Sequence, residues 1–267
     1  MIRKATVSGQ FYPGNKESLK KMISQMIVPE KAKKKAIASV SPHAGYIYSG
    51  SVAGEVFSSI ELPKNFVILG PNHTGIGHPL ALFKEGEWET PLGNVLINKE
   101  LAELILESCS LMREDVSAHN YEHSIEVQLP FLQYFVSSFK FVPICVSYLG
   151  YSQLEKTGIE LAQAIKKFGE NVLLIASTDF SHYVSQKIAE EKDGMAIKKI
   201  LELNPKGLYE IVAKERISMC GVAPTTIALK AAIELGAEKA ELIKYATSGD
   251  ISGDYSQVVG YGGIIIF

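Results

Sequence analysis

Apolar runs of strand length recur along the chain and alternate with segments that have the period of a helix. The runs lack the polar–apolar alternation of a half-exposed strand, so they predict strands buried on both faces of a sheet. These runs are Ala36–Val40, Phe66–Gly70, Phe141–Ser147, Val172–Ser177 and Val258–Phe267. The helical segments are Ser51–Ile60, Lys99–Ser108, Leu154–Phe168, Gln186–Leu203 and Thr225–Gly236. This order predicts an α/β fold with a mainly parallel central sheet flanked by helices.

We expect one domain over residues 1–267. Hydrophobic residues make up 46% of the sequence and charged residues 21%, which supplies enough apolar material for a large core. The stretch Ala81–Asn98 departs from the alternation of strands and helices, and its turn signals predict a hairpin at the edge of the sheet. It holds the only tryptophan, Trp88, for which we expect a packing role.

The charge balance argues against a nucleic-acid-binding protein. The chain has 27 Lys and Arg against 29 Asp and Glu, a net charge of −2, whereas nucleic-acid binders usually show a basic surplus. The one basic run, Lys31–Lys35, is expected to be a solvated segment before the first buried strand.

Three features predict a cytoplasmic protein. The three cysteines, an odd number without C-x-x-C spacing, indicate a reducing compartment rather than a disulfide framework. The first residues lack the apolar core of a signal peptide. No uncharged apolar run approaches the roughly 20 residues that span a bilayer, so we expect no membrane association.

Histidines follow three of the predicted strands at the point where each strand ends. His43 follows the first strand, His73 the second, and His182 the fourth, where Asp179 accompanies it. Ligands of open parallel sheets bind at the carboxyl ends of the strands, because the loops there converge. A single loop histidine is typical of a surface, but three at matching strand ends favour a shared site. Since a neutral imidazole nitrogen is a good metal ligand, this edge is a candidate metal centre.

Cys220 is a further candidate ligand. It lies just before Gly221 and a helix whose entrance carries Pro224 and Thr225. A thiol near a helix N-terminus tends to have a lowered pKa, and a thiolate binds soft and borderline metals. The alternative, a buried structural cysteine, fits Cys109 and Cys145 better, because they lie at the end of a predicted helix and inside a predicted strand.

The segment "AHNYEHSIEVQLPFLQYF" supplies more polar residues. In a helix, His123 and Glu126 share one face at i,i+3 spacing and would offer a polar pair to a pocket. Two interpretations stay open: contact with the substrate or support of the ligands, and plain hydrogen bonding in the interior. His78 has no such company and is expected at the surface.

Seven motifs occur in a characteristic order from residue 8 to the C-terminus: SGQFYPG, SPHAGYIYSG, GPNHTG, EHSIEVQLPF, STDFSHY, MCGVAPT and VVGYGG. With them the chain resembles the Memo family over nearly its whole length. The resemblance implies an α/β fold similar to that of the class III extradiol dioxygenases, which open catechol rings with non-haem Fe(II). It also implies iron or copper bound by two histidines and a cysteine, whose positions match His43, His73 and Cys220. His182 matches a catalytic histidine of the dioxygenases, with Asp179 beside it.

One departure from the dioxygenases limits what this implies. They use two histidines and a carboxylate as ligands, whereas here a cysteine replaces the carboxylate. A thiolate donates more charge and is itself open to oxidation, so the fold alone does not establish ring cleavage.

The first hypothesis is a metal-dependent oxidoreductase that acts on an unknown small substrate with Fe(II) or copper. His182, oriented by Asp179, would act as general acid or base, and His123 or Tyr46 would help to place the substrate. The second hypothesis is a module that binds a peptide or protein partner, since animal Memo proteins are linked to phosphotyrosine signalling and cell motility. Iron or copper binding without turnover is a third, and a zinc hydrolase is a weaker fourth. The substrate, the metal and the oligomeric state stay open.

Overall fold

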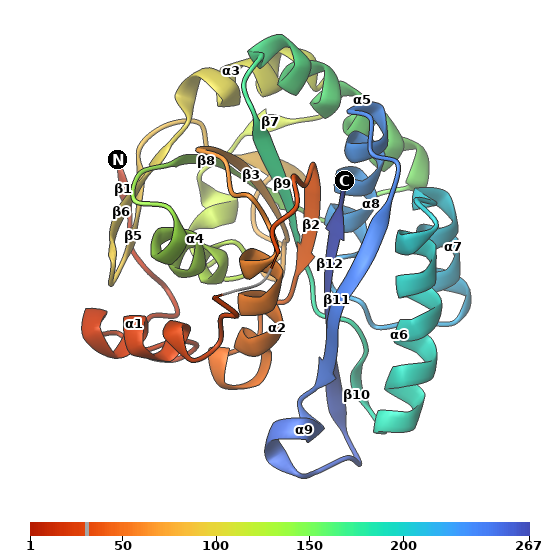
Figure 1. The fold of residues 1–267 in the computed structure, drawn as a ribbon. Helices are drawn as coiled ribbons and strands as arrows, with labels where there is room; N and C mark the ends of the chain where they lie inside the picture. The colour runs from red at the N-terminus through yellow and green to blue at the C-terminus, as the bar shows by residue number, and fades with distance from the viewer. Residues whose placement is uncertain (30–31) are drawn as a thin grey trace.

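The computed structural model describes residues 1–29 and 32–267. Within them the strands form a 12-stranded mixed sheet with the order β1-β5-β6-β8-β3-β9-β2-β12-β10; β11 also pairs with β12, β4 with β8, and β7 with β4 (Figure 1). The strands are β1 (Ile2–Arg3), β2 (Ala38–Ser41), β3 (Asn65–Pro71), β4 (Leu80–Leu82), β5 (Glu87–Thr90), β6 (Gly93–Ile97), β7 (Arg113–Glu114), β8 (Lys140–Val146), β9 (Val172–Ser177), β10 (His182–Val184), β11 (Ala240–Thr247) and β12 (Val258–Ile266). The helices are α1 (Lys16–Ser24), α2 (Tyr46–Ser58), α3 (Lys99–Ser108), α4 (Leu129–Phe135), α5 (Tyr151–Phe168), α6 (Gln186–Leu201), α7 (Pro205–Lys214), α8 (Val222–Glu234) and α9 (Gly249–Ser252).

The centre of the sheet is parallel, as the sequence predicts. β3 pairs in parallel with both β8 and β9, and β2 pairs in parallel with β9. The C-terminal strand β12 instead runs antiparallel to β2 and β11. The prediction of a mainly parallel α/β sheet is therefore confirmed, with antiparallel strands added around this centre.

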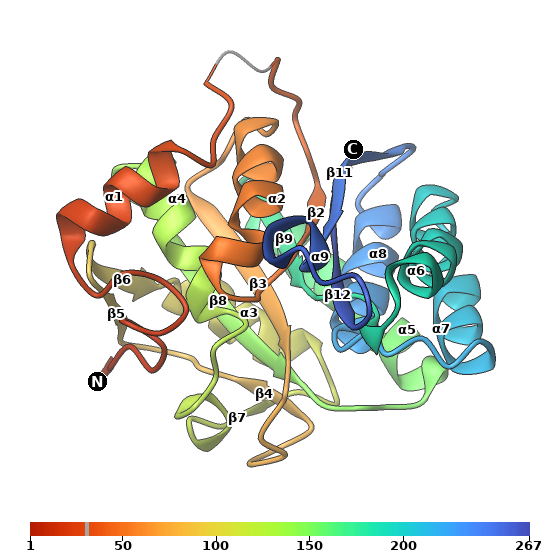
Figure 2. The same cartoon turned by 90° about the horizontal axis from the view of Figure 1, so that it is seen from below.

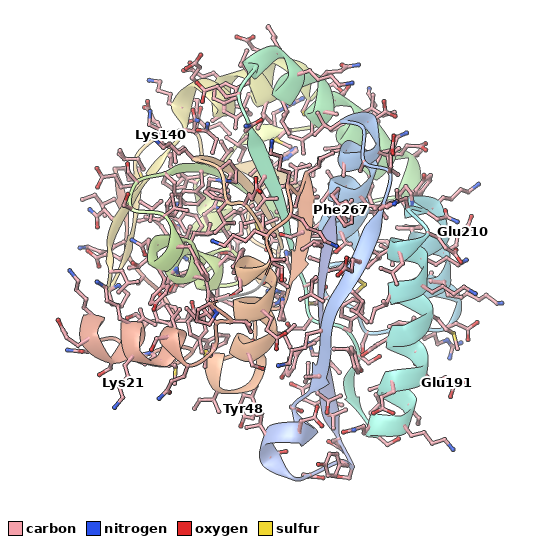
Figure 3. The ribbon with its side chains drawn as sticks, viewed as in Figure 1. Lys21, Tyr48, Lys140, Glu191, Glu210 and Phe267 are labelled. Atoms are coloured by element: carbon pink, nitrogen blue, oxygen red, sulfur yellow. The ribbon has the colours of Figure 1, made fainter. Side chains whose placement is uncertain are left out.

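Helices cover both faces of the sheet, since the apolar side chains of the central strands point to both faces and need cover on each. In β3, Val67 and Leu69 belong to one core, and the alternate residues Phe66 and Ile68 belong to the other. The first core packs under α3, α5, α6, α7 and α8, and the second under α1, α2 and α4 (Figure 2). The outer faces of these helices carry charged side chains such as Lys21, Glu191 and Glu210 (Figure 3). No helix in the described part of the chain is long and apolar enough to cross a bilayer.

The predicted hairpin is present at the edge of the sheet. β5 and β6 pair antiparallel, and β6 joins β8 in parallel. Trp88 is fully buried between the rings of Phe83 and Phe141, so its packing role is confirmed. Of the basic run Lys31–Lys35, Lys31 lies outside the described residues, and Lys34 forms a partly exposed ion pair with Glu241.

Three neighbouring strands set the position of the candidate site. β3, β9 and β2 lie side by side, and their pairing aligns Leu69 with Ala176 and Ser41 with Ser177. The loops that follow these strands therefore start next to one another at the carboxyl edge of the sheet, which is the usual binding edge of such a fold.

Candidate metal centre

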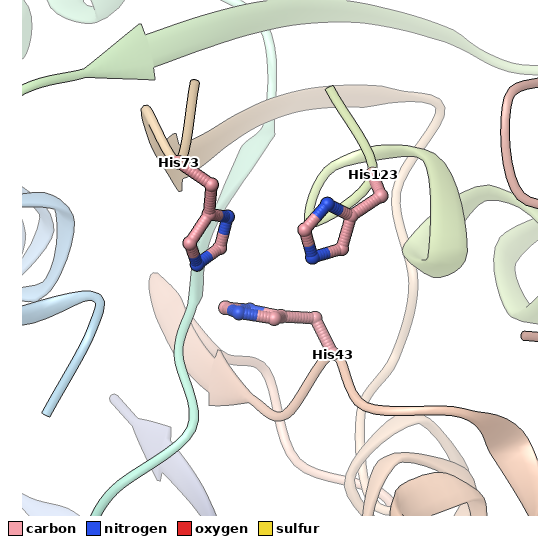
Figure 4. Close-up of side chains that lie close together, drawn as sticks. All are labelled: His43, His73 and His123. Carbon is pink, nitrogen blue, oxygen red and sulfur yellow. The ribbon is translucent and has the colours of Figure 1, made fainter. Parts of the chain in front are cut away.

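Three imidazole rings meet at the carboxyl edge. Each of His43, His73 and His123 has one ring nitrogen directed to a common point, and these three nitrogens lie within 4.8 Å of one another (Figure 4). The ring centroids are 5.2 Å apart for His43 and His73, 5.7 Å for His43 and His123, and 4.6 Å for His73 and His123. We call these residues the histidine cluster. His43 and His73 come from the predicted strand ends, and His123 comes from the segment before the short 3-10 helix Glu126–Gln128.

His43 is buried and fixed from both sides. Its backbone N–H donates to Asp179 Oδ1 at 2.8 Å, and its Nδ1 lies 3.0 Å from Ser177 Oγ. The Ser177 hydroxyl donates to Ser124 O at 2.7 Å and accepts from Gln128 Nε2 at 2.9 Å. Since its only hydrogen is used on Ser124, Ser177 can only accept from His43 Nδ1–H. The lone pair of His43 is therefore on Nε2, the nitrogen of a ligand whose other nitrogen is held by an acceptor.

The loop that carries His73 is built by a neighbouring side chain. Asn72 Oδ1 accepts from the N–H of Thr74 at 3.2 Å and of Gly75 at 2.9 Å, and Asn72 Nδ2 donates to Ile76 O at 2.8 Å. Gly75 has φ +68°, a conformation that glycine adopts without steric cost and that this turn requires. The loop is exposed, but the His73 ring stacks on that of His123.

The His123 segment approaches the end of β3 closely at Gly70. A Cβ at Gly70 would overlap Ser124 Oγ and stand 2.8 Å from Ile125 Cγ1, so only glycine admits this approach. The Glu122 carboxylate accepts from Ser124 Oγ and, at 2.9 Å, from Ile125 N. The ring of Phe11 packs on His123 with centroids 5.1 Å apart. The position of His123 thus depends on contacts far apart in the sequence.

The cluster favours neutral imidazoles. Burial, followed by the neighbouring imidazoles of His73, His123 and His182, holds the pKa of His43 well below its usual range. Loss of solvent is also the first cause that lowers the pKa of His73 and of His123. Neutral rings present lone pairs, which is the protonation state that a metal requires.

Cys220 lies beside the cluster. Its Sγ is 3.3 Å from His43 Nε2 and accepts from Asp179 N at 3.2 Å. The lowered thiol pKa predicted from the sequence is wrong for the protein alone, because burial, followed by the charge of Asp179, raises the pKa of Cys220 to about 12. The N-terminus of α8, which was expected to lower the pKa of this thiol, does not offset the effect of burial. The other two cysteines, Cys109 and Cys145, are buried as predicted.

His182 and Asp179 have separate partners. His182 Nδ1 is 2.9 Å from Ser218 O and must donate to this carbonyl, so Nε2 carries the lone pair of the neutral ring. Ser218 thus orients His182, whereas the sequence assigned that role to Asp179. Asp179 accepts from His43 N instead, and burial raises its pKa to about 6. Ser218, which holds the His182 ring, lies two residues before Cys220, whose Sγ contacts His43 Nε2, so the His182 loop lies beside the cluster.

Glu126 and Tyr46 lie in the interior behind the cluster. Glu126 forms an ion pair with Arg3 and accepts from Thr6 N at 2.8 Å and Tyr12 OH at 2.6 Å. Tyr46 is buried and donates to Val127 O at 2.6 Å. Of the two interpretations left open for Glu126, the structure supports hydrogen bonding in the interior, and it gives the Tyr46 hydroxyl a backbone partner rather than an open position.

Three supporting side chains escaped the sequence analysis. Ser177 and Gln128 fix the His43 ring, and Ser218 fixes the His182 ring. Ser177 was recognisable as the last residue of a strand at the binding edge. Gln128 and Ser218 come from segments without such a signal. His78, expected at the surface, is half-buried, and its Nδ1 contacts the backbone of Leu80.

Fold and site together define a single-domain α/β protein with a candidate centre for one metal ion at the carboxyl edge of its parallel strands. A family model described as Memo-like protein matches residues 3–265. MEMO1 family proteins of Methanopyrus kandleri and Aquifex aeolicus are 43% and 44% identical to this chain; each alignment covers 99% of this chain, and 99% and 98% of the relative. The chain belongs to the Memo family, which confirms the resemblance seen in its motifs.

A solved structure supports the fold. The crystal structure of an uncharacterized protein from Escherichia coli K12 aligns with a TM-score of 0.58 and 14% identity, covering 86% of this chain and 100% of that one. At this identity the likeness concerns the arrangement of helices and strands, and it carries nothing about chemistry.

Proposed function

We propose that this chain is a mononuclear metal-dependent oxidoreductase that acts on a small substrate with Fe(II) or copper. One observation carries the proposal: three imidazole nitrogens from separate segments lie within 4.8 Å of one another, and a thiol is in contact with one of them. Structural histidines of an interior form hydrogen bonds to different neighbours, whereas these nitrogens converge.

The donor set fits iron or copper. His43 offers Nε2 because Ser177 holds its Nδ1–H, and the lowered pKa values keep the cluster neutral. Imidazole and thiolate together suit iron and copper, and they also suit zinc, which would support hydrolysis instead. We take His43 and His73 as ligands, with Cys220 as the third. His123 is a competing third nitrogen donor, because its ring belongs to the same group.

The residues around the cluster would position and deprotonate a substrate. When bound, the metal would supply Lewis acidity and electron transfer. His182 Nε2 would accept a proton from the substrate, since Ser218 O fixes the other nitrogen as a donor. Asp179 would hold the His43 loop through the backbone N–H, and Gln128 would brace the same loop through Pro42 O at 3.0 Å.

The first test is metal analysis of protein purified without oxygen or chelator. Wild type should carry close to one iron or copper per chain, and His43→Ala and Cys220→Ser should lose it. His78→Ala is the matched control, because His78 lies outside the cluster, and it should retain the metal. His123→Ala distinguishes two roles of His123. Loss of the metal would show that His123 is a ligand, and retention of the metal would favour contact with the substrate. A wild type without metal, even after reconstitution with Fe(II), Cu(I) or Zn(II), would contradict the proposal.

Oxygen uptake then tests turnover. A metal-loaded protein should consume oxygen with a small substrate, and His182→Gln should retain the metal while it loses uptake. Tight copper binding without uptake across a broad set of small molecules would favour metal handling. A metal-free protein that captures a peptide or protein would favour the partner-binding function.

A further inference from the structure

A hollow of about 290 Å³ lies beside the candidate metal centre. It is lined by the loop after β8, which carries Tyr148, and by α7 and the turn that joins α7 to α8. Cys220 lines this hollow and also contacts His43 Nε2, so the hollow reaches the cluster through one side chain.

The walls suit a flat apolar body. Tyr148 and Tyr209 stack with centroids 6.1 Å apart and an angle of 29° between the rings, and their hydroxyls are 2.9 Å apart. Met219 and Val222 line the hollow near Cys220. Aromatic faces and a methionine sulfur both pack well against a planar ring.

Arg216 adds a charge at this hollow. Arg3 is paired with Glu126, and Arg113 donates to Ser110 O and Met112 O. Within residues 1–29 and 32–267, by contrast, the structure shows no hydrogen bond or ion pair for the Arg216 guanidinium. The nearest acidic neighbour in the sequence, Glu215, is paired with Lys214 at 3.5 Å.

The backbone at Arg216 is unusual. Its φ is +49°, a left-handed conformation that side chains other than glycine seldom adopt. Arg216 N donates to Ala213 O at 3.3 Å, and Arg216 O accepts from Lys192 Nζ at 3.4 Å, so both backbone groups are held. With Ile217 N donating to Val212 O, this is the hydrogen-bond pattern of a helix C-terminal cap, so the left-handed conformation ends α7 and fixes the backbone that carries Arg216.

We infer that this hollow binds a small planar carboxylic acid, with its carboxylate on Arg216 and its ring between the tyrosines and Met219. The guanidinium fork matches a carboxylate in two parallel hydrogen bonds, which a neutral group cannot reproduce. The end of the ring away from the carboxylate would face Cys220 and the cluster. The acid would be a substrate only under the proposed function, on which this part of the inference rests. Binding in the hollow itself requires no metal.

Benzoate is the probe, titrated into chelator-treated protein and followed by ligand-observed NMR. Arg216→Gln should weaken benzoate binding about tenfold or more, because a charge-assisted pair is lost. Arg113→Gln is the matched control and should leave the affinity unchanged. Benzamide, which has the same shape without the charge, should bind wild type more weakly than benzoate by a similar factor.

A second readout is alkylation of the cysteines by iodoacetamide at alkaline pH, because burial raises the pKa of the Cys220 thiol and only the thiolate reacts. Benzoate should protect Cys220, while the buried Cys109 and Cys145 stay unreactive with and without it. Three results would each overturn the inference: equal affinity in the two arginine variants, displacement of benzoate by equimolar phosphate, or no saturable binding at millimolar concentrations. Because the titration uses metal-free protein, its failure is independent of the metal analysis that tests the proposed function.

Discussion

The segment from Ser117 to Gln128 contributes to two polar regions with opposite character. On one side Glu126, Arg3 and Thr6 form a network, here called the Arg3–Glu126 network, in which each charged group has several partners. On the other side the histidine cluster directs nitrogens toward one another. The first region is closed by its own hydrogen bonds, and the second leaves donor atoms for a ligand. Nitrogen atoms that converge on one point, rather than polarity alone, distinguish the candidate site from the Arg3–Glu126 network.

The largest expected effect comes from breaking the closed region. Arg3→Ala would leave the Glu126 carboxylate buried without its cation and should lower the free energy of unfolding by about 3–5 kcal/mol. Denaturant unfolding measures this loss. Lys4→Ala, which breaks the exposed pair with Glu89, is the control and should change little. Equal losses in the two variants would show that the network is not a stabilising unit.

A smaller loss is expected where the two regions meet the sheet. Gly70→Ala would force the His123 segment away from β3 and should cost about 1–3 kcal/mol. The control is Gly194→Ala in α6, where a Cβ meets nothing within 4 Å and should stabilise the helix by roughly 0.5–1 kcal/mol. If His123 is a ligand, Gly70→Ala also weakens metal binding, whereas a purely structural His123 leaves the affinity unchanged.

Removing a support of the open region should act on the ligand rather than on the fold. Ser177→Ala deprives His43 Nδ1–H of its acceptor and should weaken metal binding about 10–100-fold, measured by competition with a chelator. Ser39→Ala is the control. Ser39 is buried in β2, the strand that precedes His43, and its hydroxyl has no hydrogen-bond partner. Similar affinities in the two variants would argue against His43 as a ligand.

The last comparison concerns pH. Burial is the first cause that lowers the pKa of His119 to about 3, so this ring stays neutral in the folded protein while it takes up a proton below pH 6.5 when unfolded. The unfolded state then binds more protons, and stability falls with decreasing pH by about 1.4 kcal/mol per unit between pH 6.5 and 3. Between pH 7 and 5, wild type should therefore lose about 2 kcal/mol more than His119→Phe. Other groups titrate in both proteins, so parallel pH curves would contradict this role for His119.

Much of the fold and two of the three histidines of the cluster follow from local sequence. Strands buried on both faces leave an uninterrupted apolar run, and His43 and His73 lie where such runs end. His123 was found as a polar residue but not as a member of the cluster, because its position depends on Phe11 and on the close approach at Gly70. Neither contact can be predicted from the spacing of residues within the segment.

The pair His123 and Glu126 shows the limit of helical spacing. The i,i+3 rule would place both on one face, but residues 122–123 have no regular structure, residues 124–125 form a turn, and the second 3-10 helix begins only at Glu126. His123 therefore faces the cluster, while Glu126 faces the N-terminal segment 114 to 123 residues away in the chain. The partner of a buried charge is set by the tertiary fold, so it could not be read from the segment itself.

The sheet order has a consequence for synthesis on the ribosome. β2, which ends just before His43, pairs with β9 on one side and with β12 on the other, so its two neighbours are made about 130 and 220 residues later. The strand that precedes the first histidine keeps both edges unpaired until β9 has been made, and one edge until almost the whole described chain has emerged. Assembly of the candidate metal centre is therefore a late event in the folding of this domain.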